Sequence, residues 1–301
     1  MIASSLSEGS STCNAGLDWP EIRSQFALLG ELRLGYRAVQ KAGNMTEMPP
    51  PVVVALERDL FFGVRIQDVA RAYGAHLETV EDADALGRAL ECWPELVLID
   101  LAATTGWEAV VWRAKHSPYI RSIPFVAFGS HVDTGALRAA RAAGCDHAWA
   151  RSRFVTELPR LVQSALYPPT RWVEGWDEPP QPGLFRGLDQ FNSGEYWDCH
   201  ETLELLWRAE PRPLRDLYQG ILQVGVAFYH LGRCNYSGAL KMLGRGLPRL
   251  RDLPETCQRV AVKELFVAAK AVGVRIVALG ARGVGEFDLD SLPRVRMVEP
   301  P

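Results

Sequence analysis

His200, Glu201 and Glu204 lie within one predicted helix, and side chains of these types could bind a metal ion and activate water. Residues four apart share a helix face, so one ion could meet both His200 and Glu204. His230, on the next predicted helix, could supply a third ligand. Two histidines and one carboxylate suit catalytic Zn²⁺ or Fe²⁺, and Glu201 could then serve as the general base. The pattern is compatible with a metal site that activates water.

The same residues also fit a structural interpretation. Arg215, Gln219 and Gln223 recur every four residues on the neighbouring helix. Antiparallel pairing would place Arg215 and Gln219 near Glu204, and it would place Gln223 near His200. Arginine beside the carboxylate would oppose a cation, and buried polar groups need partners. The alternative is therefore a buried hydrogen-bonded network in a non-enzymatic signalling or protein-interaction module, and whether the protein is an enzyme stays open.

Asp100 is a separate candidate for chemistry. It ends Leu96–Asp100, a run of four large apolar residues that leads into one carboxylate and is typical of a buried strand. In an open parallel sheet, ligands and reactive groups collect at the carboxyl ends of the strands. We therefore expect Asp100 to lie at a functional edge of such a sheet.

The elements that would position Asp100 alternate between strand and helix over residues 51–167. Five strand–helix pairs in this length predict a doubly wound, five-stranded parallel sheet with helices on both faces. The predicted strands are Val52–Leu56, His76–Val80, Leu96–Asp100, Phe125–Phe128 and Cys145–Ala150.

Beyond residue 167 the pattern becomes helical. Proline-rich residues 168–182 predict a linker, residues 183–280 a bundle of about five helices, and residues 281–301 a tail. Residues 1–50 read as a disordered or loosely helical extension. The fold class is thus α/β plus all-α. The predicted helices are Leu184–Asn192, Tyr196–Ala209, Leu214–Leu231, Ser237–Leu250 and Cys257–Leu279.

The strand and helix order over 51–167 resembles the receiver domains of response regulators, in which an aspartate at the position of Asp100 is phosphorylated. The resemblance implies that Ser130 is the hydroxyl after the fourth strand and that Arg151 replaces a lysine after the fifth. The family also uses an acidic pair to hold Mg²⁺, and the segment Leu56-Glu57-Arg58-Asp59 matches it with one carboxylate at best. We therefore expect a degenerate receiver without Mg²⁺, with aspartyl phosphorylation as the alternative. Receivers commonly dimerise, which implies a homodimer through this domain.

A second resemblance covers residues 184–252. It is to a bacterial and archaeal family known as domain of unknown function 309, an all-helical family labelled as predicted metal-dependent hydrolases. It implies metal-ligand roles for His200, Glu204 and His230, and a catalytic role for Glu201. The matching residues are Phe191-Asn192, Gly194-Glu195-Tyr196, His200-Glu201, Leu203-Glu204, Trp207, Gln219-Gly220, Gln223, Tyr229-His230 and Gly238-Ala239.

Composition limits the kinds of molecule that we expect the chain to bind. A net charge of −3 over 301 residues favours neither nucleic acid nor anionic membranes as a partner. Apolar runs fall short of the roughly 20 residues that a membrane span needs. Six scattered cysteines without a C-x-x-C pair favour a reducing, cytoplasmic location. Lys241, Arg245 and Arg249 recur every four residues, either as a solvated helix face or as a contact for an anionic partner, and the protein partner is unknown.

Overall fold

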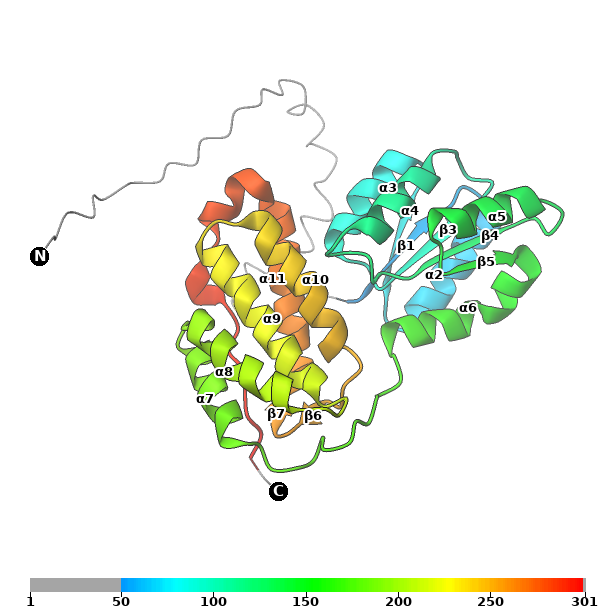
Figure 1. Cartoon of the computed structure of the whole chain (residues 1–301). Coiled ribbons are helices and arrows are strands. Elements are labelled where there is room, and N and C mark those ends of the chain that lie inside the picture. The colour runs from blue at the N-terminus through cyan, green and yellow to red at the C-terminus, as the bar shows by residue number, and fades with distance from the viewer. Residues whose placement is uncertain (1–49, 300–301) are drawn as a thin grey trace, which may run out of the picture. The chain divides into compact units, whose positions relative to one another are not determined.

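The computed structural model describes residues 50–299 (Figure 1). A flanked sheet comes first and a group of longer helices follows, which confirms the α/β plus all-α class. The predicted extension, apart from Pro50, lies outside the described residues. The domain boundaries predicted at residues 167 and 183 remain a prediction.

Five short strands form the predicted parallel sheet, in the order β2-β1-β3-β4-β5. Every neighbouring pair is parallel. This is the flavodoxin-like, doubly wound order, in which the chain reverses direction across the sheet between β1 and β3. Receiver domains share it. The strands are β1 (Val52–Leu56), β2 (His76–Val80), β3 (Leu96–Asp100), β4 (Phe125–Gly129) and β5 (His147–Ala150).

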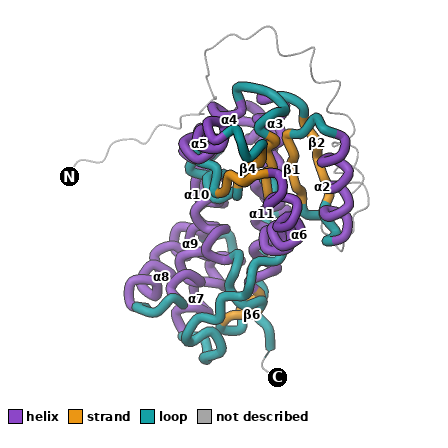
Figure 2. The backbone as a smooth tube through the Cα atoms, turned by 90° about the vertical axis from the view of Figure 1, so that its right-hand side faces the viewer, coloured by secondary structure: helices purple, strands orange, loops and turns teal. Residues whose placement is uncertain are grey.

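Two layers of helices bury the two faces of this sheet (Figure 2). One apolar cluster joins the sheet to α2 and α6, where Phe128 stacks on Phe154 with ring centroids 3.8 Å apart. The other cluster joins it to α3, α4 and α5. Burial on both faces explains why the strands are continuous apolar runs. The helices are α2 (Leu60–Ala72), α3 (Ala83–Ala89), α4 (Trp107–His116), α5 (Thr134–Ala143) and α6 (Arg151–Leu166).

Aspartates begin three of these helices. The side chains of Asp59, Asp82 and Asp133 each accept a hydrogen bond from a backbone N–H in the first turn of α2, α3 and α5. Such caps satisfy donors that the helix itself leaves unpaired. All three follow the carboxyl ends of strands. Three of the carboxylates at this edge of the sheet therefore already accept hydrogen bonds from helix N-termini.

Five longer helices follow, as predicted. They are α7 (Pro182–Asn192), α8 (Tyr196–Ala209), α9 (Arg215–Gly232), α10 (Tyr236–Leu250) and α11 (Val262–Gly283). Pro211 and Pro213 lie in the break between α8 and α9, where the sequence placed it. The side chain of Asn192 pairs with both backbone groups of Val295, which holds the C-terminal segment against α7.

One predicted element begins in the wrong place. A helix was expected from Cys257, but Thr256–Cys257 (β6) and Val260–Ala261 (β7) form a short antiparallel hairpin, and α11 starts at Val262. The turn residues Gln258 and Arg259 both have positive φ, at 45° and 63°. Two-residue hairpin turns with positive φ usually contain Asn-Gly or Asp-Gly. Gln-Arg is atypical, so the sequence did not indicate a turn here. The turn is anchored by Gln258, which is 1% exposed and accepts a 2.8 Å hydrogen bond from the Tyr218 hydroxyl.

Two general features bear on the predicted surroundings of the protein. Among the described residues, no helix has the length and apolar character to cross a bilayer. The five cysteines between residues 50 and 299 are free thiols. The cytoplasmic location stays a prediction.

Helices α9 and α10 cross at close range because glycines face each other there. A Cβ on Gly246 would lie 3.0 Å from the Gly220 carbonyl oxygen. A Cβ on Gly220 would lie 2.5 Å from Leu250 Cδ2 and 2.7 Å from its Cγ. Leu250 is 1% exposed and has little room to move. The crossing therefore requires glycine at these positions, and it fixes how α9 presents its polar residues.

We expect Gly220→Ala to lower the free energy of unfolding by about 1–3 kcal/mol, because the added methyl overpacks a closed interface. Gly87→Ala is the matched control: a Cβ on Gly87, also inside a helix, meets nothing within 4 Å. That substitution should stabilise the protein by about 0.5–1 kcal/mol. Urea denaturation of both variants measures the difference. Equal effects at the two positions would contradict the close crossing.

Candidate functional site

At the carboxyl edge of the sheet, the structure brings together Asp100 and Arg151. The Asp100 side chain is 3% exposed, and Arg151 Nη2 lies 3.0 Å from its Oδ2 and 3.2 Å from its Oδ1. Oδ1 also accepts the backbone N–H of Ala102 at 3.0 Å. The guanidinium lies over the ring of Phe62, 5.2 Å from the centroid. Both oxygens of the predicted phosphoacceptor are therefore engaged.

Glu57 is a second buried carboxylate at this edge, 3% exposed. Its Oε1 accepts the backbone N–H groups of Arg58 and Asp59 at 2.8 and 2.6 Å, whereas its Oε2 is buried without a partner. Burial raises the pKa of Glu57 to about 7, and the nearby charge of Asp100 adds to the rise, although the backbone bonds oppose it. Glu57 is thus a titratable group in the neutral pH range.

Ser130, the third predicted member of the site, follows β4 and is exposed. Its side chain makes no hydrogen bond to Asp100 or Arg151 within the described range. Two of the three residues predicted for a phosphorylation site, Asp100 and Arg151, are thus in direct contact, whereas the Ser130 hydroxyl does not bond to either.

A receiver-like edge implies Mg²⁺, which carboxylate oxygens would hold. The residues present do not fit that ion. One oxygen of Glu57 is taken by two backbone donors, and Asp59 caps α2 through Phe61 N–H at 2.9 Å. The Arg151 guanidinium supplies the positive charge beside Asp100. Arg151 contacts both Asp100 oxygens through the one nitrogen Nη2, and this fixed positive charge beside Asp100 disfavours a second cation there.

Glu57 gives a testable pH dependence. Because its pKa is higher in the folded chain than its usual value of 4.5, the folded state binds more protons between about pH 4.5 and 7. Wild-type stability should therefore fall, relative to Glu57→Gln, as pH rises through that range, by at most about 1.4 kcal/mol per pH unit. Glutamine keeps an oxygen for the two backbone donors. Denaturation at several pH values tests this, and a pH-independent difference between the two proteins would refute it.

The residues predicted to bind a metal are spread along α8 and α9. His200 stacks beside the half-exposed Trp197, with ring centroids 5.6 Å apart, and its Nδ1 is buried without a partner. Glu204 pairs with Arg208 on its own helix at 3.0 Å. Glu201 is exposed to solvent. His200 and Glu204 therefore contact different neighbours.

His230 is held by the start of the next helix. Its Nδ1 lies 3.2 Å from Asn235 Nδ2, while Asn235 Oδ1 caps α10 through Gly238 N–H at 2.9 Å. A Cβ on Gly238 would lie 2.8 Å from the His230 ring, so glycine is needed there. Burial, and then the charge of Arg233, lowers the pKa of His230. A neutral ring that accepts from Asn235 fits this position.

Between residues 50 and 299, no three side chains of His, Cys, Asp or Glu are grouped so as to hold a metal. The predicted supporting residues are also dispersed. Arg215 lies over the Trp207 ring, 5.3 Å from its centroid, rather than beside Glu204. No side-chain hydrogen bond joins Arg215, Gln219 or Gln223 to the metal candidates in the described part of the chain. The metal assignment therefore stays a prediction.

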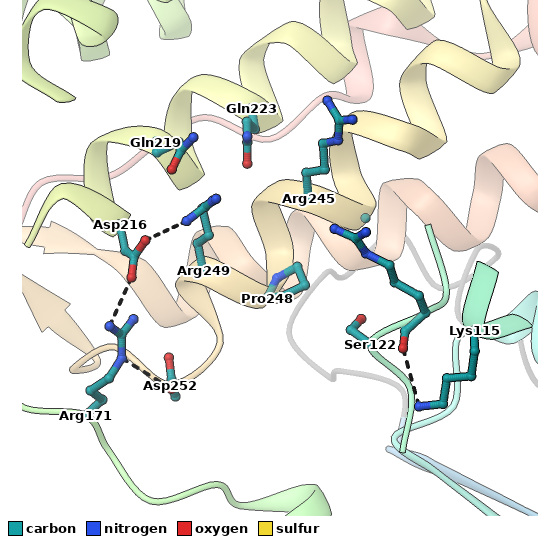
Figure 3. Close-up of a pocket in the computed structure, with 12 residues that line it drawn as sticks. Lys115, Ser122, Arg171, Asp216, Gln219, Gln223, Arg245, Pro248, Arg249 and Asp252 are labelled. Atoms are coloured by element: carbon teal, nitrogen blue, oxygen red, sulfur yellow. Dashed lines mark hydrogen bonds and ion pairs between the residues drawn. The ribbon is translucent and has the colours of Figure 1, made fainter. Parts of the chain in front are cut away.

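Gln219 and Gln223 instead line a polar pocket of about 840 Å³, shown in Figure 3. Asp216 anchors one side of it, bound by Arg249 at 2.7 Å and by Arg171 at 3.0 Å. Sequence reasoning did not assign Asp216 or Arg171 to a site. The four-residue spacing of Arg245 and Arg249 was the one signal available, and from the sequence it was better explained by a solvated helix face.

Comparison with known families bears on this helical region. Residues 184–242 match the family model described as "Domain of unknown function (DUF309)". The match includes His200, Glu204, Gln219, Gln223 and His230, as the resemblance predicted. Arg245 and Arg249 lie beyond it. The DUF309 match thus covers the stacked pair Trp197 and His200 and the α9 residues that line the pocket.

A curated relative matches part of the chain. It is the uncharacterized protein YpuF of Bacillus subtilis (strain 168), which is 37% identical over 54 residues. This alignment covers 18% of this chain and 31% of YpuF, so the chain spans about a third of the relative that it matches.

Solved structures resemble the first region. The receiver domain of a sensor histidine kinase from Pseudomonas aeruginosa PAO1 is 18% identical, with a TM-score of 0.35, over 39% of this chain and 98% of that one. The chemotaxis response regulator CheY4 of Vibrio cholerae is 14% identical, with a TM-score of 0.34, over 39% of this chain and all of that one. The strand order of the sheet itself carries the receiver-like assignment.

Proposed function

We propose that this chain is a non-enzymatic regulatory protein whose receiver-like region is held in one state by an internal ion pair. The observation that carries the proposal is the contact of Arg151 with both oxygens of Asp100. A carboxylate that receives a phosphoryl group must present a free oxygen to the donor. Here each oxygen already accepts a charged hydrogen bond, which is roughly twice as strong as a neutral one.

Burial strengthens this ion pair. Asp100 is almost completely shielded from water, so its attraction to Arg151 is screened less than at a surface. Removing Arg151, whose own side chain is 37% exposed, would leave the buried Asp100 charge uncompensated and would destabilise the folded state. The pair therefore supports a constitutive arrangement of the sheet edge, where a switch would need a weakly held carboxylate.

The helical region supports the same proposal. Its predicted ligands have separate partners: Glu204 pairs with Arg208, and His230 with Asn235. Metal-dependent hydrolysis would require His200, Glu204 and His230 to converge on one ion. The alternative function, hydrolysis in the bundle, thus depends on a rearrangement of α8 against α9.

Phosphorylation is the direct test of the receiver-like region. Full-length wild type and Asp100→Asn are incubated with acetyl phosphate and Mg²⁺ and analysed by Phos-tag gel and intact mass. We expect no stable phosphate on either protein, while a response regulator with an intact acidic pair, treated in parallel, becomes labelled. One phosphoryl group on wild type that is missing from Asp100→Asn would show that the ion pair does not block the reaction.

Metal content is the direct test of the helical region. We expect the untagged full-length chain to lack stoichiometric metal, and we expect His200→Ala and Glu204→Ala to leave its metal content unchanged. Inductively coupled plasma mass spectrometry measures this, and circular dichroism checks that both variants fold. Near-stoichiometric Zn or Fe that disappears in both folded variants would restore the hydrolase interpretation.

A further inference from the structure

The polar pocket beside α9 and α10 carries an excess of positive charge. Five of its lining side chains are basic and two are acidic. Both acids are already engaged: Asp216 pairs with Arg171 and Arg249, and Asp252 lies 3.3 Å from Arg171 Nε. Arg245 is exposed and makes no hydrogen bond or ion pair with the described residues. The pocket therefore has positive charge available for a ligand.

Four polar atoms of the lining residues are buried without a hydrogen bond: Gln223 Oε1 and Arg249 Nε, and also Asp252 Oδ1 and Arg171 Nε, which lies 3.3 Å from Asp252 Oδ2. Gln223 is only 8% exposed, yet its Oε1 has no hydrogen bond. Arg249 Nε is likewise buried and unpaired, although its Nη1 binds Asp216. An unsatisfied buried polar group costs about 1–3 kcal/mol, so most such groups in proteins have a partner. Gln223 Oε1 and Arg249 Nε point to a ligand that both accepts and donates hydrogen bonds.

The helix crossing explains why Gln223 stays in this position. A Cβ on Gly246 would lie 3.1 Å from Gln223 Cβ, so the α10 backbone closes over the base of that side chain. Its amide extends toward the pocket, beside Gln219 from the same helix (Figure 3). Arg245 and Arg249 extend from α10 toward the same space (Figure 3). Residues four apart share a helix face, so each helix contributes two side chains.

We propose that this pocket binds a small phosphate-bearing molecule. Arg245 and Arg249 would hold the phosphate, because guanidinium groups match its oxygens in pairs of hydrogen bonds. Lys115 is paired with Asp146 at 2.7 Å, so among the described lining residues the charge without a carboxylate partner comes from Arg121 and Arg245, and two such charges favour a phosphate over a single carboxylate. Gln223 and Gln219 would bind hydroxyl or amide groups of the same molecule. The site is separate from the sheet edge, so this proposal stands independently of the regulatory function proposed above.

The test measures binding of pyrophosphate and of AMP to the full-length chain by isothermal titration calorimetry, with thermal shift as a second readout. We expect saturable binding that weakens as salt concentration rises. Arg245→Ala should weaken it at least about tenfold, which corresponds to about 1.4 kcal/mol. Gln223→Met, which keeps the volume of the side chain, should weaken binding of AMP. Lys241→Ala is the matched control, because Lys241 is exposed on α10 but does not line the pocket.

The outcomes separate the possibilities. Binding of pyrophosphate shows that phosphate groups suffice, and binding of AMP alone identifies a nucleotide as the ligand class. No binding of either probe at concentrations on the order of 1 mM would overturn the proposal. Affinity that is unchanged in Arg245→Ala, or lowered equally in Lys241→Ala, would also overturn it, because binding would then come from general surface charge. Circular dichroism confirms that each variant is folded.

Discussion

The close crossing of α9 and α10 is the constraint on which the helical region depends. Eleven of the 18 residues of α9 are buried, so the helix has little surface on which to place polar side chains. Gly220 and Gly246 bring the two backbones together at the crossing. Two polar residues of α9, Gln219 and Gln223, line the pocket beside the crossing, whereas Arg215 and His230 lie at other points along the helix. The packing of its apolar residues thus leaves α9 few positions at which a polar side chain can reach a pocket.

Limited space also determines which buried carboxylate at the carboxyl edge of the sheet has a basic partner. Two carboxylates, Glu57 and Asp100, are buried at this edge; burial raises the pKa of Glu57, and the nearby charge of Asp100 adds to the rise. Arg151 neutralises one of them. The other keeps two backbone hydrogen bonds and has its pKa shifted toward neutrality instead. One guanidinium cannot satisfy both carboxylates, so the edge contains one permanent ion pair and one group that titrates.

The sequence predicted the strands well, because strands buried on both faces are continuous runs of apolar residues. Leu96–Asp100 and Val52–Leu56 lie where they were predicted. The hairpin at Gln258 was missed, because its strands are only two residues long and its turn residues are atypical. Contacts between helices were harder to predict. Periodicity gives the face on which Arg215 lies, but the crossing of α8 and α9 decides that it meets Trp207 instead of Glu204.

A motif that is compact in sequence is divided among several places in this structure. Residues within the DUF309 match include Asn192, which binds the C-terminal segment, and Gly238, which makes room for His230. Gly220 lies at the helix crossing, and Gln223 reaches the pocket. Several residues of the match therefore have structural roles, whereas Gln223 lines a pocket together with Arg245 and Arg249 from outside the match.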